Sequence, residues 1–201
     1  LTHALTLYLA TNYNKPPQNP QMDARIVYKP LHSALFEDTW QSSWLHEDFT
    51  RLVSALKTNN KAEVETIKGS GFIREISRGI YSFPFLKPEM CRSIIEEVEN
   101  FKDHAKRKKI PIQRPNSMNN YGLILSQMGL TGLITNLQSE YIYPMAQMLF
   151  PVQSSSGFSS HHTFIVSYEP SKDTHLDMVC PCLSLSVCLF HTLTYTHTHT
   201  L

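Results

Sequence analysis

The segment His162-Thr-Phe-Ile-Val-Ser-Tyr-Glu-Pro-Ser-Lys-Asp-Thr-His-Leu-Asp177 contains the most informative pattern in the chain. Its apolar and β-branched residues predict a strand over residues 163–168, and the polar residues 169–173 predict a turn. Residues two apart on an extended backbone point to the same face, so His175 and Asp177 would project together. An imidazole and a carboxylate are two of the three ligands in a 2-His-1-carboxylate iron site. On its own, the triplet is more simply explained as a turn His followed by an Asp that caps the next element.

Other motifs precede this triplet in a fixed order. They are Phe83-Pro-Phe-Leu86, a helix over 89–101, Pro115-Asn-Ser-Met-Asn-Asn-Tyr-Gly122 and the strand Phe164-Ile-Val-Ser-Tyr168. Together with Thr174-His-Leu-Asp177 they resemble the Fe(II)- and 2-oxoglutarate-dependent dioxygenases. The chain looks most like the 2-oxoglutarate- and iron-dependent oxygenase domain-containing proteins, which are related to lysyl and prolyl hydroxylases. The resemblance covers about residues 72–178 and, more loosely, residues 28–71.

The resemblance implies a fold and a set of site residues. The expected class is α+β, with an N-terminal helical segment followed by an incomplete double-stranded β-helix (jelly-roll) oxygenase core. His175 and Asp177 match the first two iron ligands of the family. Tyr168 resembles a Tyr that hydrogen-bonds 2-oxoglutarate, although a half-buried strand Tyr is an equal alternative. Asn119, Asn120 and Tyr121 would lie near the substrate entrance, or would form an Asn-rich turn that hydrogen-bonds its own backbone.

The implied activity is hydroxylation with Fe(2+) and 2-oxoglutarate, and with ascorbate keeping the iron reduced. The implied substrate is a Lys or Pro side chain of a protein, or a small molecule. Two other functions stay open. One is a noncatalytic binding or regulatory isoform that meets a partner through Trp40 and Trp44. The other is an unrelated α+β binding module in which the His-x-Asp triplet is accidental.

The character of the sequence changes after Met178. Residues 179–201 alternate Leu with Ser and then Thr with His, as translated CT and CA dinucleotide repeats would. The hypothesis is that they are read-through of a retained intron and that the oxygenase is C-terminally truncated. A His-rich metal tract is the alternative. Nothing after Met178 matches the distal iron-ligating His or the co-substrate-binding Arg of the family, so little or no turnover is expected from this chain.

Length and composition narrow the remaining possibilities. The 201 residues suggest one domain with a smaller appendage. We divide them into residues 1–70 (linker and helices), 71–178 (partial oxygenase domain) and 179–201 (aberrant tail). The net charge of +1 gives no indication of nucleic-acid binding, and no apolar run is long enough to span a bilayer. Four cysteines are too few for a disulfide scaffold, which favours a reducing, intracellular location.

The apolar spacing predicts the secondary structure of the central region. It indicates amphipathic helices over 38–56 and 62–68, short strands over 71–76 and 79–86, and one kinked or two short helices over 135–150. Core packing is preferred to partner docking for the two Trp residues. Pro88 suits the first turn of the next helix. The predicted buried stripe of that helix consists of Met90, Ile94, Ile95, Val98 and Phe101. Its predicted solvated side consists of Glu96, Glu97, Glu99, Lys102 and Asp103.

Two groups of polar residues have competing interpretations. The run Lys106-Arg-Lys-Lys109 could be a nuclear-targeting or nucleic-acid patch. Basic residues at a helix C-terminus also complement the macrodipole, and this interpretation is preferred. The adjacent His161 and His162 diverge on a strand, so they are interpreted as polar edge residues rather than as metal ligands.

Overall fold

The structure is a computed structural model that describes residues 2–10, 28–114, 122–158, 160–168 and 185–191. Its strands are β1 (Thr2–Ala10), β2 (Arg74–Ser77), β3 (Ile80–Ser82), β4 (Gly122–Ile124), β5 (Ser160–Tyr168) and β6 (Leu185–His191). Its α-helices are α2 (Glu47–Lys57), α3 (Lys61–Gly69), α4 (Pro88–Lys108), α5 (Thr131–Leu137) and α6 (Tyr143–Leu149). Shorter turns are the 3-10 helices η1 (Ser33–Phe36), η2 (Ser42–Trp44) and η3 (Leu125–Met128), and the π-helix η4 (Gln138–Ile142). This composition confirms the α+β class.

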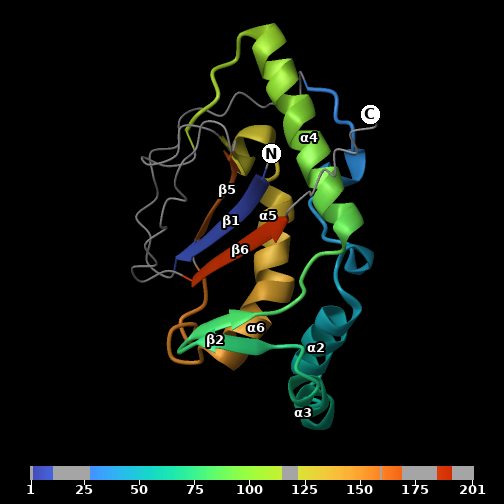
Figure 1. The fold of residues 1–201 in the computed structure, drawn as a ribbon, viewed down its shortest axis with the longest axis vertical. Coiled ribbons are helices and arrows are strands. Elements are labelled where there is room, and N and C mark those ends of the chain that lie inside the picture. Colours follow the sequence, from blue (N-terminus) through green and yellow to red (C-terminus); the bar gives the residue numbers. More distant parts are fainter. Residues whose placement is uncertain (1, 11–27, 115–121, 159, 169–184, 192–201) are drawn as a thin grey trace, which may run out of the picture.

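The larger sheet joins distant parts of the sequence. Its four strands lie in the order β4-β5-β1-β6 and every pair is antiparallel. β1, β5 and β6 come from the three regions 1–70, 71–178 and 179–201, so these regions share one sheet (Figure 1). The described strands form this sheet and one hairpin, and the double-stranded β-helix stays a prediction. The sequence analysis predicted strand β5 but neither β1 nor β6.

The smaller sheet is the hairpin of β2 and β3. The chain reverses at Gly79, whose φ of 74° lies in the left-handed region that glycine adopts without strain. The register shifts between Glu75 and Ser77, which is a β-bulge in β2. Both predicted strands are confirmed, and both are shorter than their apolar runs suggest.

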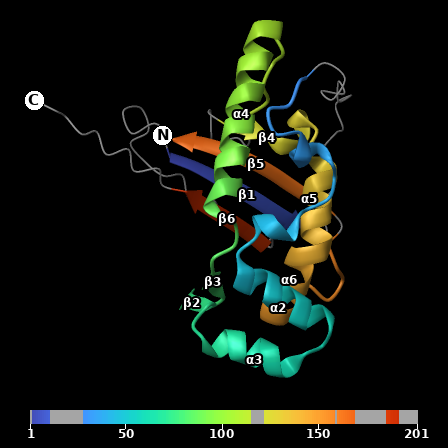
Figure 2. The same ribbon diagram turned by 90° about the vertical axis from the view of Figure 1, so that its right-hand side faces the viewer.

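Helix α4 is the longest helix and runs across the strands of the large sheet (Figure 2). Pro88 occupies its first turn, where its missing N–H has no intrahelical partner to lose. Met90, Ile94, Val98 and Phe101 are buried as predicted, and Ile95 is half-buried. The prediction that Glu97 lies on the solvated side is wrong, because its exposed fraction is 0%.

Helices α2 and α3 form an antiparallel pair at one end of the molecule (Figure 2). The ring of His46 and the side chain of Asn60 accept backbone N–H groups at their respective N-termini. The predicted helix over 38–56 begins only at Glu47. Before it, Trp40 is buried and meets the half-buried Trp44 edge to face at 5.5 Å. Trp40 is therefore a core residue and Trp44 packs against the core with part of its side chain exposed, which agrees with the preferred interpretation.

Helices α5 and α6 are joined without a break by η4, as one interrupted helix. The backbone N–H of Tyr143 bonds to the carbonyl of Gln138, five residues earlier. Pro144, the next residue, has no N–H and cannot continue the usual four-residue spacing. The π-helical turn η4 accommodates the missing hydrogen bond; single π-helical turns of this kind occur inside α-helices. The predicted kinked helix over 135–150 is thus confirmed, although it begins at Thr131.

The hydrophobic core packs residues of the helices against strand β5. Its fully buried members include Phe49 from α2, Phe101 from α4, Leu133 from α5 and Ile165 from β5. Among the described residues, no helix is both long enough and apolar enough to cross a membrane.

Candidate functional site

Strand β5 precedes the His-x-Asp segment in sequence and is covered on both of its faces. It lies between β4 and β1 in the sheet. Phe164, Ile165 and Val166 are at most 4% exposed. Because consecutive strand residues point to opposite faces, burial of all three means that both faces of β5 are covered. The position at which the chain leaves β5 is therefore set by the core.

Strands β4 and β5 bring two predicted site segments to the same end of the sheet. β4 begins at Gly122, which lies opposite Val166, and Ile124 lies opposite Phe164. In this antiparallel register the start of β4 is next to the end of β5. The predicted lining residues 119–121 come immediately before Gly122, and the predicted iron ligands follow Tyr168 in sequence. What the structure places together is therefore the start of β4 and the end of β5.

The predicted site residues themselves are placed only in part. His175, Asp177, Asn119, Asn120 and Tyr121 lie outside the described residues. The backbone of Tyr168 is the last of β5 and lies opposite Thr2 of β1, while its side chain is not described. Within the described ranges, no three His, Cys, Asp or Glu side chains are grouped so as to hold a metal ion. Iron ligation by His175 and Asp177 therefore remains a prediction.

Gln127 anchors the chain that leads into the 115–121 segment. Its Nε2 atom donates to the carbonyl oxygen of Pro111 at 2.6 Å, and its Oε1 atom accepts the backbone N–H of Gln113 at 3.0 Å. One side chain thus satisfies two backbone groups and holds residues 111–113 against η3. The role of Gln127 could not be predicted from the sequence, because a lone Gln carries no signal for partners that lie 14 and 16 residues away.

His161 lies at the opposite end of β5, where the described strands pair with β5 on one side only. Its Nε2 atom is 3.0 Å from the hydroxyl oxygen of Thr135 on α5. Partial burial, and secondarily the neighbouring His162, lower the pKa of His161. The ring is therefore held as a neutral hydrogen-bonding group that ties β5 to α5.

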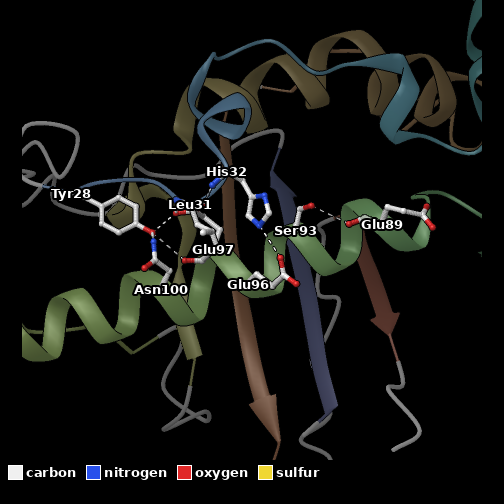
Figure 3. Close-up of polar contacts among 8 residues, drawn as sticks. All are labelled: Tyr28, Leu31, His32, Glu89, Ser93, Glu96, Glu97 and Asn100. Carbon is white, nitrogen blue, oxygen red and sulfur yellow. Dashed lines mark hydrogen bonds and ion pairs between the residues drawn. The ribbon is translucent and has the colours of Figure 1, made fainter.

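A second polar cluster fixes the segment before η1 to helix α4 (Figure 3). The buried Glu97 carboxylate accepts hydrogen bonds from the Tyr28 hydroxyl and from the backbone N–H groups of Leu31 and His32. The Asn100 amide donates to the Tyr28 oxygen at 2.8 Å. The neighbouring Glu96 is half exposed and pairs with the His32 ring at 2.9 Å.

The Tyr28 phenol is suited to this position. Its burial, followed by the hydrogen bond to Glu97, raises the pKa of Tyr28, so the phenol keeps its proton and remains a donor. With one phenol and two backbone N–H groups around it, the Glu97 carboxylate has its acceptor sites filled without a neighbouring cation. We interpret this cluster as structural, since its donors and acceptors pair with one another, and the ring of His104 packs against Tyr28 edge to face at 5.3 Å.

Comparison with known proteins connects the chain to oxygenases. It is 34% identical over 160 residues to the 2-oxoglutarate and iron-dependent oxygenase domain-containing protein 2 of Xenopus tropicalis, covering 77% of this chain and 42% of the relative. It is 35% identical over 113 residues to the Arabidopsis thaliana oxygenase domain-containing protein ICU11, covering 55% of this chain and 28% of the relative. The chain thus spans less than half the length of these relatives.

A more distant relative has a named substrate class. The human multifunctional procollagen lysine hydroxylase and glycosyltransferase LH3 is 21% identical over 140 residues, covering 68% of this chain and 17% of that protein. No solved structure matches the chain significantly. The model of the OGFOD2-like domain matches residues 25–155, which is well over half of the 201 residues. The chain therefore belongs to the OGFOD2-like family, whose named members are 2-oxoglutarate and iron-dependent oxygenase domain-containing proteins.

Proposed function

We propose that this chain carries part of the active site of an Fe(II)- and 2-oxoglutarate-dependent dioxygenase. The observation that carries the proposal is the meeting of β4 and β5. Gly122 lies opposite Val166, so the strand that follows Asn119–Tyr121 in sequence begins beside the end of the strand that precedes His175–Asp177 in sequence. Membership of the OGFOD2-like family supports the same activity.

The donor chemistry of the proposed metal site suits ferrous iron in part. His175 supplies an imidazole and Asp177 a carboxylate, which are two of the three protein ligands in a facial triad. When bound, iron and 2-oxoglutarate would allow O2 to hydroxylate a C–H bond: one oxygen atom of O2 enters the substrate and the other enters succinate, as 2-oxoglutarate loses carbon dioxide. The residues of this chain would orient the bound iron and 2-oxoglutarate and shield them from water. We assign Tyr168 to a hydrogen bond with 2-oxoglutarate.

Metal binding can be tested without turnover. Anaerobic calorimetric titration of the chain with Fe(II) in the presence of 2-oxoglutarate should show a binding heat that His175→Ala or Asp177→Ala removes. His161→Ala is the matched control, because it removes one imidazole from a position that we assign to structure. Equal binding by all four proteins would contradict the assignment of His175 and Asp177.

We further propose that these 201 residues alone turn over little 2-oxoglutarate. No residue after Met178 matches the distal His or the Arg that pairs with the distal carboxylate of the co-substrate, and a bidentate Arg recognises carboxylates strongly. The expected succinate formation is close to that of His175→Ala. Efficient succinate formation by the wild-type chain, lost in His175→Ala, would overturn this proposal while supporting the metal site.

For the substrate, we propose a protein side chain, with lysine as the first candidate. This rests on the name of the lysine hydroxylase relative. Ascorbate as the reductant and an intracellular location complete the proposal. The noncatalytic alternative has less support, because Trp40 is buried in the core and only part of the Trp44 side chain is exposed.

A further inference from the structure

The C-terminal end of α4 concentrates positive charge at one end of the molecule. Lys106, Arg107, Lys108 and Lys109 are all exposed, and so is Arg114 in the segment that follows. We call these five residues the α4 basic cluster. Figures 1 and 2 both show this end of α4 projecting at the end of the molecule opposite to α2 and α3.

The cluster is not neutralised by neighbours. Elsewhere on the described surface, cations such as Lys57, Lys68 and Lys102 have carboxylate partners within 3 Å. Among the described residues, no member of the cluster has a carboxylate within ion-pairing distance. Steps of 100° along a helix also spread consecutive side chains around its end. The cluster is therefore a solvated, divergent group of cations.

Helix capping explains only part of this arrangement. Cations in the last turn stabilise a helix through its macrodipole, and this effect falls off within that turn. Lys109 lies beyond the helix with a left-handed φ of 55°, and Arg114 lies further along the chain. The last buried residue of α4 is Ala105, so the cluster begins where contact with the core ends. The α4 basic cluster therefore contains more positive charge than stabilisation of the helix C-terminus requires.

The charge of the chain is strongly asymmetric as a result. The whole chain has a net charge of +1, so with five cations in the cluster the remaining residues carry a net negative charge. A concentrated patch of this kind steers an anionic partner to one end of the molecule, although the overall charge gives no hint of it.

We propose that the α4 basic cluster is a docking surface for the phosphate backbone of nucleic acid. Lys and Arg side chains that neutralise closely spaced phosphates release counterions, which is the main source of sequence-independent affinity. A lipid surface fits less well, because membrane-surface helices pair their cations with an exposed apolar face. The apolar face of α4 is packed into the core as far as Ala105.

Fluorescence anisotropy with a labelled 20-base-pair DNA duplex tests the proposal. The wild-type chain should bind with an affinity that falls as salt rises, with a slope of log K against log salt of about −4 for four to five phosphate contacts. The variant with Lys106, Arg107, Lys108 and Lys109 all changed to Gln should lose at least tenfold in affinity. Gln keeps nearly the same helix propensity.

The matched control removes the same charge elsewhere. It changes Lys57, Lys61, Lys68 and Lys87 to Gln, all at or near α2 and α3. Its affinity for DNA should fall much less than that of the cluster variant, and changing the three Lys of the cluster to Arg should preserve binding. Equal losses in both Gln variants would overturn the proposal, since they would indicate a net-charge effect. Stronger binding to phosphatidylserine vesicles than to DNA would also overturn it.

Discussion

The hydroxyl of Tyr28 donates a hydrogen bond to the Oε1 atom of Glu97, 69 residues further along the chain. Both residues are buried, so this contact joins the segment before η1 to the middle of α4 inside the core. It also explains why an acidic residue can occupy the buried side of an amphipathic helix. A buried polar group is tolerated when its hydrogen-bonding capacity is filled.

Tyr28→Phe removes both the phenolic donor to Glu97 and the oxygen that accepts from the Asn100 amide, while the backbone donors to Glu97 stay in place. We expect a loss of about 1–3 kcal/mol in the free energy of unfolding, because a buried carboxylate oxygen loses one partner. Tyr81→Phe is the control, since no hydrogen bond involves the Tyr81 hydroxyl among the described residues. Urea denaturation at pH 7 measures both. A loss of the same size in the control would contradict the assignment.

Glu97→Ala and Glu96→Ala compare neighbouring carboxylates with opposite environments. Loss of the Glu97 side chain leaves two backbone N–H groups and a phenol hydroxyl without their acceptor. We therefore expect the free energy of unfolding to fall by about 3 kcal/mol or more. Loss of Glu96 removes an exposed pair with His32 and should cost at most about 1 kcal/mol. Thermal and urea unfolding would distinguish the two, and similar losses would argue against the buried role of Glu97.

Gln127→Leu tests the anchor of residues 111–113. Both hydrogen bonds of the side chain are lost, so the Gln113 amide should exchange its hydrogen roughly 5–30-fold faster, as expected for the loss of about 1–2 kcal/mol of local protection. Amides in α2 should be unaffected. Hydrogen exchange followed by mass spectrometry measures both regions, and unchanged exchange at Gln113 would rule out the anchor.

The His161 ring should make stability depend on pH. Its folded-state pKa is lowered, so the unfolded chain binds more protons at acid pH and the native state loses stability as pH falls below about 6.5. This contribution is fully present above pH 6.5. His161→Gln should flatten the decline in the urea midpoint between pH 7.5 and 5. An identical decline in the variant would show that other groups cause it.

Gly132 and Gly69 are helical glycines that should respond to alanine in opposite directions. A Cβ at Gly132 would lie 2.3 Å from Cγ of Asp38, so the Asp38 carboxylate must move, and we expect a loss of about 1–2 kcal/mol despite the better helix propensity of Ala. A Cβ at Gly69 meets nothing within 4 Å and should be neutral or stabilising by up to about 1 kcal/mol. Thermal unfolding of both variants tests this contrast.

The sequence predicted what depends on local periodicity. Pro88 and the apolar spacing after it identified α4, and Pro144 indicated the interrupted helix. Glu97 was wrongly predicted to be solvated because it is acidic, although it lies next to the buried stripe. Its hydrogen-bond partners lie about 65 residues away in the sequence. Long-range partners are invisible to a pattern of neighbours. The same reason hid the anchor Gln127 and the pairing of β1 with β5.

The candidate site was predicted by resemblance, and its iron ligands and lining residues lie outside the described residues. The iron ligands and the lining residues were named from motifs that are about 55 positions apart in sequence. Only the register of β4 against β5 brings the ends of their flanking strands together. Spacing in the sequence could not supply that register, because Phe164, Ile165 and Val166 are all buried and this continuous apolar pattern does not distinguish one register from the next.

The pairing of β1 with β5 also has a consequence for biosynthesis. Thr6 lies opposite Phe164, so β1 cannot pair with β5 until roughly 150 further residues have been synthesised. Their synthesis takes on the order of 10–30 s at ordinary rates of translation. The local α2–α3 pair can fold long before that. Throughout the interval the nascent β1 has unsatisfied backbone groups on both sides, which makes this segment a natural client for chaperones that bind chains at the ribosome.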